Sequence, residues 1–119
     1  MLLELAALSL EAGRIDDAES KARESLWIAR QIRDYGGRVF GVGVLASAAA
    51  VRGEVDRAGR LWGAIENDRV GAPLGGWLRH RARCEARVTE VAGVQLDAAL
   101  VVGRDLSLDQ AVEVALADA

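Results

Sequence analysis

His80 and Cys84 are the chain's only histidine and only cysteine, and they lie four residues apart. On a helix this spacing puts both side chains on one face, where they could hold a metal ion or pair a thiolate with a base. No third ligand of fitting type lies nearby in the sequence, so such a site would be underfilled. We therefore expect a partly buried cysteine beside a surface histidine, with no metal, no cofactor and no catalytic residue.

The densest basic charge of the chain surrounds this pair. Arg79, Arg83 and Arg87 are spaced four residues apart and would form one stripe along a helix, which could bind a phosphate group or an acidic partner. Glu85 and Glu90 share the segment, aromatic residues do not alternate with the arginines, and the whole chain carries a net charge of −3. DNA contact is therefore not expected, and solvated or internally paired charge is the simpler interpretation.

The arginine stripe also leaves an alternative function open. Residues 71–77 precede it and form a candidate pocket beside it. With Arg79, Arg83 and Arg87 this pocket could bind an anionic metabolite. The chain would then be a small anion- or metabolite-binding α-helical domain or enzyme.

Each of the three tryptophans could anchor a bound peptide, because Trp contributes strongly to protein interfaces. Core packing is the better interpretation for Trp62, which faces a neighbouring helix. Trp77 follows a glycine pair and is expected to fasten its loop to the following helix. Trp27 flanks the inward stripe of its helix, and we predict that it forms part of a contact surface at the edge of the stack.

Composition indicates which elements position these side chains. Ala, Leu and Val dominate the 119 residues, aromatic residues make up 4%, and Pro occurs once, which favours one all-α domain over residues 1–119. A single cysteine allows no intramolecular disulfide, as is usual in a reducing compartment. The chain opens without a basic leader, and no apolar run is long enough to span a bilayer. We expect a cytoplasmic protein without membrane contact.

One short pattern occurs twice, as GRIDDAE at residues 13–19 and GEVDRAG at residues 53–59. The two copies lie 40 residues apart. Each begins with a Gly that follows a helical stretch, over about 2–12 or 38–52, and glycine can adopt the left-handed conformation that ends a helix. The pattern therefore predicts a helix, a tight turn at Gly13 or Gly53, and a second helix in both copies.

Other positions of the two copies fit stacked helices. Asp16 and Asp17 fall in the first turn of the second helix, where the helix dipole favours negative charge, so they need no acid–base role. Ala18 and Ala58 lie where two helices press together. The expected inward faces are Ala18, Ala22, Ser25, Leu26, Ala29, Ile32, Leu61, Trp62 and Ile65. Expected outer ion pairs are Asp17 with Lys21, Glu19 with Arg23, and Asp56 with Arg60.

The other segments are less regular. Four glycines in residues 34–43 predict that the third helix either starts loosely or packs very closely on its neighbours. A loop then leads to a helix over about 75–92 and a short one over about 95–102. The last helix opens with Ser107 and Gln110 at capping-box spacing. Its apolar stripe of Leu108, Val112 and Leu116 must be covered.

The repeated unit resembles the tetratricopeptide repeat, which combines a Gly near the first helix end, a small residue early in the second helix and an aromatic residue four later. Gly53, Ala58 and Trp62 match this pattern, whereas Ala22 takes the aromatic position of the first copy. The resemblance implies antiparallel helix hairpins stacked as a right-handed superhelix and closed by a C-terminal capping helix. Its parts would be repeat one over about 1–35, repeat two over about 36–70, and C-terminal helices over about 74–118.

A second resemblance covers AGRLWGAIENDRVGAP at residues 58–73 and GRDLSLDQAVEVALADA at residues 103–119. Both segments are similar to the C-terminal end of the tetratricopeptide-like region in actinobacterial LuxR-type ATP-binding transcriptional regulators and related cyclase-linked ATPases. Leu96 and Leu100 depart from that family, which would carry larger aromatic residues there. The sequence contains no Gly-rich phosphate loop. The resemblance therefore implies the C-terminal sensor or interaction part of such a regulator.

Together these patterns predict a non-catalytic helical-repeat scaffold that binds protein through shape and charge, not an enzyme. Two repeat units are few for a stable array, so the first helix should expose an apolar edge. Another subunit or further repeats upstream should cover this edge, and we predict self-association as a homodimer. The predicted contact residues are Trp27, Arg79, Arg83 and Arg87.

Overall fold

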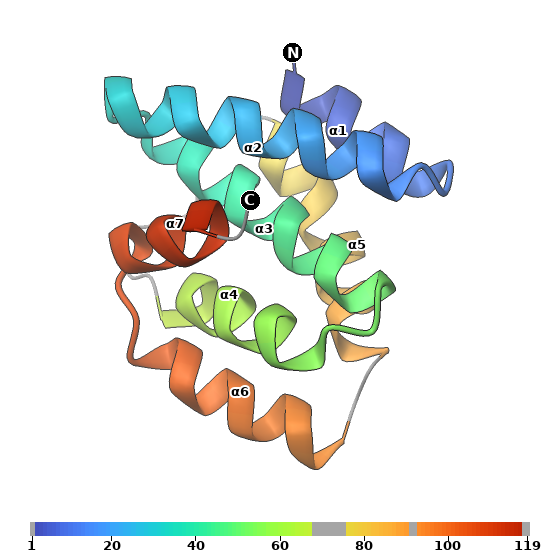
Figure 1. The fold of residues 1–119 in the computed structure, drawn as a ribbon, viewed down its shortest axis with the longest axis vertical. Helices are drawn as coiled ribbons and strands as arrows, with labels where there is room; N and C mark the ends of the chain where they lie inside the picture. The colour runs from blue at the N-terminus through green and yellow to red at the C-terminus, as the bar shows by residue number, and fades with distance from the viewer. Residues whose placement is uncertain (1, 68–75, 91–92, 118–119) are drawn as a thin grey trace.

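A computed structural model describes residues 2–67, 76–90 and 93–117 of the chain. Within these ranges the chain forms seven α-helices and no strand, which confirms the predicted all-α class. The helices are α1 (Leu2–Glu11), α2 (Ile15–Ile32), α3 (Tyr35–Val51), α4 (Val55–Asn67), α5 (Gly76–Thr89), α6 (Val94–Arg104) and α7 (Leu108–Ala117) (Figure 1). None of these described helices is both long and apolar enough to cross a lipid bilayer.

The two glycine corners, which end α1 and α3, have the same backbone geometry. Gly13 and Gly53 both have a φ of 81°. Each glycine amide donates to the carbonyl oxygen three residues back, at 3.1 and 3.0 Å, and each following amide donates to the carbonyl five residues back at 2.8 Å. These two bonds form the Schellman motif, which satisfies the last carbonyls of a helix. The helix–turn–helix unit predicted from the repeated pattern is therefore confirmed in both copies.

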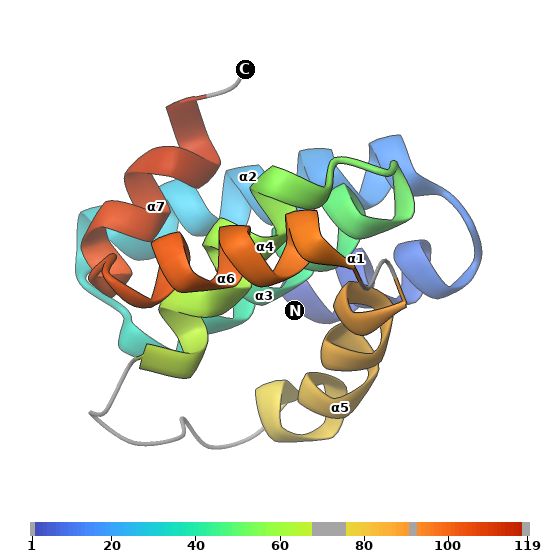
Figure 2. The ribbon, with the colours of Figure 1, turned by 90° about the horizontal axis from the view of Figure 1, so that it is seen from below.

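Helix α3 is the centre of the molecule, and every residue from 39 to 50 is buried. It packs against α1, α2, α4, α5 and α7, as the two perpendicular views show (Figures 1 and 2). A helix that is apolar on all sides is suited to such an interior position. Its Gly, Ala and Val side chains are small, so five neighbouring helices can approach it at once.

The start of α3 decides between the two expectations for residues 34–43. The helix begins at Tyr35, earlier than expected, because the Asp34 side chain accepts a hydrogen bond from the Gly37 amide at 3.1 Å and caps it. Gly41 faces α2, and a Cβ added there would lie 3.0 Å from a methyl carbon of Leu26. The close-packing alternative is therefore confirmed, and the glycines lie inside the helix.

The last helix lies across the middle of the molecule. Helix α7 occupies the space between α2 and α4, over α3, whereas α6 lies on the opposite side of α4 (Figure 1). Val112 is 1% exposed, and Leu108 and Leu116 are partly buried against the core, so the expected apolar stripe is covered. The resemblance implied a helix that caps the end of a superhelix; α7 instead fills a groove between two earlier helices.

The predicted capping box at the start of α7 is present. The Ser107 amide donates to the Gln110 side chain at 2.8 Å, and the Gln110 amide donates to the Ser107 hydroxyl at 3.1 Å. These reciprocal bonds satisfy two amides that the helix leaves without partners. The interaction is local in sequence, which explains why spacing alone predicted it.

Two of the three expected ion pairs on the outer faces are confirmed, those of Asp17 with Lys21 and of Asp56 with Arg60. The third is wrong, because Glu19 pairs with Arg52, the residue that follows α3, at 2.7 Å. Arg52 lies outside α2, so residue spacing within α2 could not indicate it. These charges therefore join the two repeat units as well as face solvent.

The expected inward faces are correct except near the end of α2. Ala18, Ala22, Leu26 and Ala29 are buried, as are the predicted residues of α4. Ile32, however, is 68% exposed, and Ser25 is only partly buried. Ile32 lines an open groove beside the start of α3, so its aliphatic side chain meets solvent although Ala29 in the same turn is buried.

Candidate functional site

The histidine and cysteine of α5 do not form a reactive pair. Cys84 is 2% exposed, and this burial is the main cause that raises the pKa of its thiol to about 11, against smaller opposing effects of Arg87 and Ser47. The thiol is therefore protonated at neutral pH. The His80 ring stacks on Phe40, with 5.5 Å between ring centroids. Among the described residues, no three His, Cys, Asp or Glu side chains are grouped to hold a metal ion.

The arginine stripe is only partly described. Arg83 is mostly exposed and forms an ion pair with Glu11 at the end of α1, so this arginine joins two helices. Arg87 is partly buried. The side chain of Arg79 and most of the candidate pocket over residues 71–77 lie outside the described residues. The stripe thus has one defined role, the attachment of α5 to α1.

Two of the three tryptophans lie in the core. Trp62 and Trp77 are each 1% exposed, and their ring centroids are 6.1 Å apart. Trp62 takes the expected core position. For Trp77, the expectation that it fastens its loop to the following helix stays a prediction, because that loop lies outside the described residues. The Trp77 ring packs against Phe40 and against Gly43, where an added Cβ would lie 2.3 Å from the ring. Only a glycine at this turn of α3 leaves room for the indole.

Trp27 is the exposed tryptophan, as expected for an edge position. It lies on α2 and is 53% exposed. Other large apolar side chains are exposed on the same pair of helices, Leu5 and Leu8 on α1 and Ile28 and Ile32 on α2. We refer to these four aliphatic residues as the apolar edge. Several large apolar side chains exposed on one pair of helices make this side of the molecule a candidate interaction surface.

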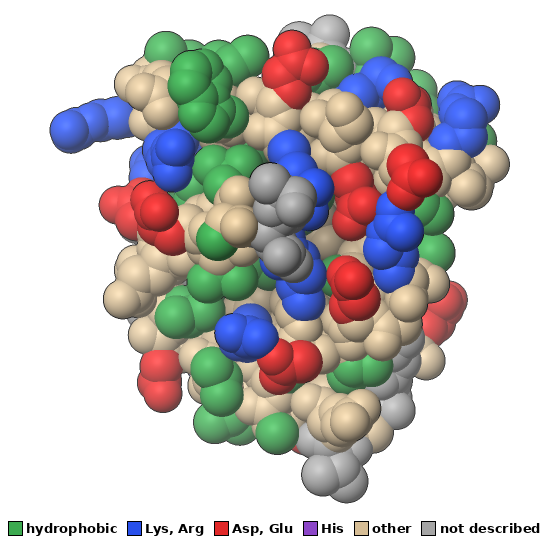
Figure 3. All heavy atoms as spheres, viewed as in Figure 1, with side chains coloured by type: hydrophobic (Ala, Val, Ile, Leu, Met, Phe, Trp, Pro, Cys, Tyr) green, Lys and Arg blue, Asp and Glu red, His purple; other side chains and the backbone are tan. Residues whose placement is uncertain are grey.

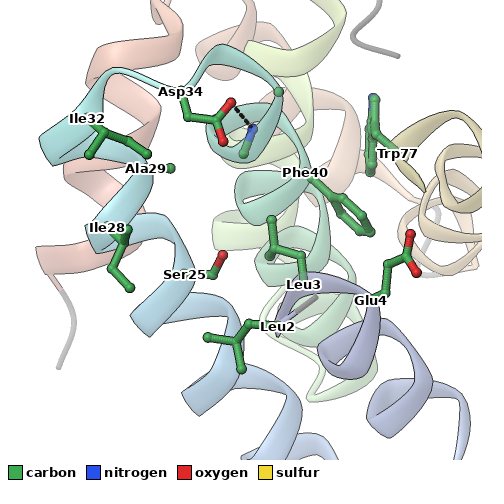
Figure 4. Close-up of a pocket in the computed structure, with 12 residues that line it drawn as sticks. Leu2, Leu3, Glu4, Ser25, Ile28, Ala29, Ile32, Asp34, Phe40 and Trp77 are labelled. Carbon is green, nitrogen blue, oxygen red and sulfur yellow. Dashed lines mark hydrogen bonds between the residues drawn. The ribbon is translucent and has the colours of Figure 1, made fainter. Parts of the chain in front are cut away.

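A groove of about 370 Å³ adjoins the apolar edge, between α1, the end of α2 and the start of α3 (Figure 4). Its apolar lining includes Leu2, Leu3, Ile28, Ile32 and Phe40, with Trp77 at its inner end. The polar lining is limited to Glu4, Ser25, Asp34 and backbone. Such a lining favours an apolar side chain over a charged ligand.

Sequence reasoning identified Trp27 but missed the groove. Its walls come from four helices, and Ile32 was interpreted as part of an inward stripe. The available signal was the opening segment MLLELAALSL, in which leucines occur on more faces than one buried stripe requires. The exposed Leu5 and Leu8 come from this segment.

The acidic pair at the start of α2 is structural, as expected. The Ser9 hydroxyl of α1 donates to Asp17 at 2.6 Å, and Lys21 pairs with the same carboxylate at 2.5 Å. These hydrogen bonds, that of Lys21 first, lower the pKa of Asp17 below its ordinary value. Asp16 pairs with Arg52, the residue that follows α3, but its side chain is 93% exposed, so this pair adds little to stability. Asp17 thus joins α2 to α1.

No protein-family model, curated protein or solved structure matches this chain. The geometry of the described residues and the motifs in the sequence therefore carry the functional argument.

Proposed function

We propose that this chain is a non-catalytic helical-repeat scaffold that binds protein, first of all a second copy of itself. The motifs in residues 58–73 and 103–119 support a place as the C-terminal interaction part of a cytoplasmic, LuxR-type bacterial transcriptional regulator. The observation that carries the proposal is the apolar edge beside an open groove. The two glycine corners of equal geometry support the tetratricopeptide-like arrangement.

Exposed aliphatic side chains provide the driving force for association. Leu5 and Leu8 are 50% and 53% exposed, and each would gain roughly 1 kcal/mol if an interface buried its remaining surface. They lie one helical turn apart on α1, so both can enter the same partner surface. A pair of such anchors, surrounded by smaller contacts, is typical of helix-in-groove recognition.

A second copy fits this edge because α1 both carries the protruding leucines and forms one wall of the groove. In a two-fold dimer the same patch of each copy forms both sides of the interface. Leu5 and Leu8 of one copy would then pack towards the groove of the other, which Ile28 and Ile32 border. The predominantly apolar lining of the groove matches the chemistry of those side chains.

The titratable groups of the candidate sites support a structural role over a catalytic one. The Cys84 thiol is protonated at neutral pH, Asp17 accepts a hydrogen bond from Ser9 of α1, and Asp16 and Arg83 form ion pairs with Arg52 and Glu11. Trp27 extends the contact surface along α2 and is available to a further protein partner.

Sedimentation equilibrium of the wild-type chain and of the double variant Leu5→Glu/Leu8→Glu tests self-association. We expect a wild-type dimer with a dissociation constant of about 10 µM or tighter, and a monomeric double variant that keeps its helical circular dichroism spectrum. The matched control is Val101→Glu/Val102→Glu, which places two charges on exposed aliphatic positions of α6 and should leave the dimer intact. A wild-type monomer at 100-fold this concentration range, roughly 1 mM, contradicts the proposal.

A further inference from the structure

A second cavity, of about 470 Å³, lies where α2 ends, α3 begins and α7 starts. Its lining includes Arg30, Arg33 and Arg38, which we call the arginine corner, together with Asp109, Val112 and Glu113 of α7. Figure 3 shows basic side chains near this end of α2, and others are spread over the rest of the same face. We propose that the arginine corner is a binding site for the phosphate group of a small anionic ligand. This site is separate from the apolar edge and does not depend on self-association.

The charges around the cavity leave one arginine without a partner. Arg30 pairs with Glu113 at 3.2 Å, and Arg38 pairs with Asp109. The Arg33 backbone amide donates to the Ala29 carbonyl oxygen, but its guanidinium group forms no ion pair or hydrogen bond with any residue in the described part of the chain. Three guanidinium groups thus meet two carboxylates, and the cavity keeps a positive charge within a chain whose net charge is negative.

The two existing ion pairs can give way to a stronger ligand. The Glu113 and Asp109 side chains are 71% and 80% exposed, and ion pairs of such exposed groups contribute little to stability. A phosphate group carries more charge than a carboxylate and offers three oxygens to the forked guanidinium groups. It can therefore compete with either carboxylate for Arg30 and Arg38.

Arg38 lines the cavity with a guanidinium group that its own carboxylate partner does not fully satisfy. Its side chain is 19% exposed, and its Nε atom is buried and forms no hydrogen bond. Buried N–H groups are nearly always paired in folded proteins, so the pair with Asp109 leaves this guanidinium with unused hydrogen-bonding capacity. Arg38 also lies in the first turn of α3, where the positive end of the helix dipole attracts anions.

The backbone at Arg33 indicates that its side chain matters. Arg33 has a φ of 57°, and among the described residues it is the only non-glycine with a positive φ. The other two tight corners, at Gly13 and Gly53, use glycine for this conformation. An arginine at such a position costs stability relative to glycine, and strained positions of this kind often occur at ligand sites. The positive charge that Arg33 adds to the arginine corner offers a reason why an arginine occupies this position.

Isothermal titration with inorganic pyrophosphate at constant ionic strength tests the proposal. We expect saturable binding with a dissociation constant below about 1 mM, weakened at least about tenfold in Arg33→Gln. The matched control, Arg14→Gln, removes the same charge at the opposite end of α2, about 27 Å away along an 18-residue helix, and should bind like the wild type. O-phosphoserine should bind at the same corner more weakly, whereas serine should not bind.

A second variant distinguishes loss of binding from loss of folding. Arg33→Gly removes the guanidinium group and also relieves the backbone, so it should fold at least as stably as the wild type and still lose pyrophosphate binding. The proposal is overturned if the wild type shows no saturable binding up to about 10 mM, a concentration at which millimolar sites fill. It is also overturned if Arg33→Gly binds like the wild type, if Arg14→Gln weakens binding as much as Arg33→Gln, or if serine binds as well as O-phosphoserine.

Discussion

Gly59 of α4 and Ala99 of α6 approach so closely that a Cβ atom added to Gly59 would lie 2.4 Å from the Cβ of Ala99. One turn further along, Gly63 of α4 and Gly103 of α6 repeat the arrangement. A Cβ atom added to Gly63 would lie 2.5 Å from the Leu100 carbonyl oxygen. Small residues at i,i+4 positions of both helices therefore bring the two backbones into contact. This packing holds α6 against the second repeat unit.

Gly103→Ala should destabilise the protein by about 2 kcal/mol, although alanine normally favours a helix. The new methyl group would lie 2.3 Å from the Arg60 carbonyl oxygen, and backbone atoms cannot rotate away as a side chain can. Urea unfolding, followed by circular dichroism, measures the change. Val101→Ala, at an exposed position of the same helix, is the control and should change stability by less than about 0.5 kcal/mol. Equal stability of Gly103→Ala and wild type would show that the helices can separate without cost.

Gly13→Ala and Gly53→Ala should each lower the free energy of unfolding by about 1 kcal/mol. An added Cβ meets no atom within 4 Å at either corner, so the whole cost comes from the left-handed backbone. Because the two corners share one geometry, the two losses should agree within about 0.5 kcal/mol, as measured by chemical unfolding.

Arg33→Gly is a control for which the expected change in stability has the opposite sign, because this variant replaces a non-glycine residue at a positive φ. It should raise stability by roughly 0.5–1 kcal/mol. Loss of stability in this variant, or a clear difference between the two glycine corners, would contradict the backbone explanation.

Cys84 should make stability fall at alkaline pH. Burial raises the pKa of its thiol from an ordinary 9.0 to about 11, so an unfolded chain loses this proton at a lower pH than the folded one. The contribution to the free energy of unfolding is constant below the unfolded pKa. It then declines as pH rises from 9.0 towards about 11, by up to roughly 2–3 kcal/mol.

Cys84→Ala isolates this effect, because it loses packing at every pH but has no thiol to ionise. The stability difference between wild type and Cys84→Ala should therefore narrow as pH rises through the window from 9.0 to about 11. Urea unfolding at several pH values measures it. Parallel curves, or rapid modification of the native thiol by iodoacetamide at neutral pH, would mean that Cys84 is accessible.

Arg57→Met should loosen α7 selectively. The Arg57 guanidinium donates to the carbonyl oxygen of Ala115 at 2.9 Å and contacts that of Val114 at 3.5 Å, near the end of α7 where carbonyls lack intrahelical partners. Methionine keeps the apolar stem but loses both contacts, which should cost about 1–2 kcal/mol. Amide hydrogen exchange should accelerate in α7 more than in α3.

Glu113→Gln is the matched control for this helix, since it breaks only the exposed pair with Arg30. It should change stability by less than about 0.5 kcal/mol and leave exchange in α7 nearly unchanged. If Glu113→Gln loosens α7 as much as Arg57→Met does, then α7 is held in its groove by the exposed ion pair of Glu113 with Arg30. The hydrogen bonds from Arg57 to the carbonyl oxygens of α7 would then not be what holds it.

Features that depend on a few neighbouring residues could be predicted from the sequence. The corners at Gly13 and Gly53 follow from glycine's freedom to adopt a positive φ after an apolar helix, and the capping box of Ser107 and Gln110 follows from residue types three positions apart. The buried Ala18 and Ala58 follow from helical periodicity. Each of these interactions closes within one or two helical turns, so the local sequence contains all of its partners.

Features that depend on which helices meet could not be predicted in this way. The burial of Trp77 against Gly43, the pairing of Glu19 with Arg52 and the exposure of Ile32 each require a neighbour that is distant in sequence or absent. The same holds for the arginine corner, which joins the end of α2 to α7.

The sequence by itself therefore determined where the repeated helices turn and which faces of α2 and α4 are buried, apart from the last turn of α2. Only the tertiary structure decided that α7 lies between α2 and α4 and that a groove opens beside α1. The physical reason is that apolar burial has no direction: an amphipathic helix such as α7 gains similar free energy from any apolar groove that fits it. The shape of the available grooves selects its place.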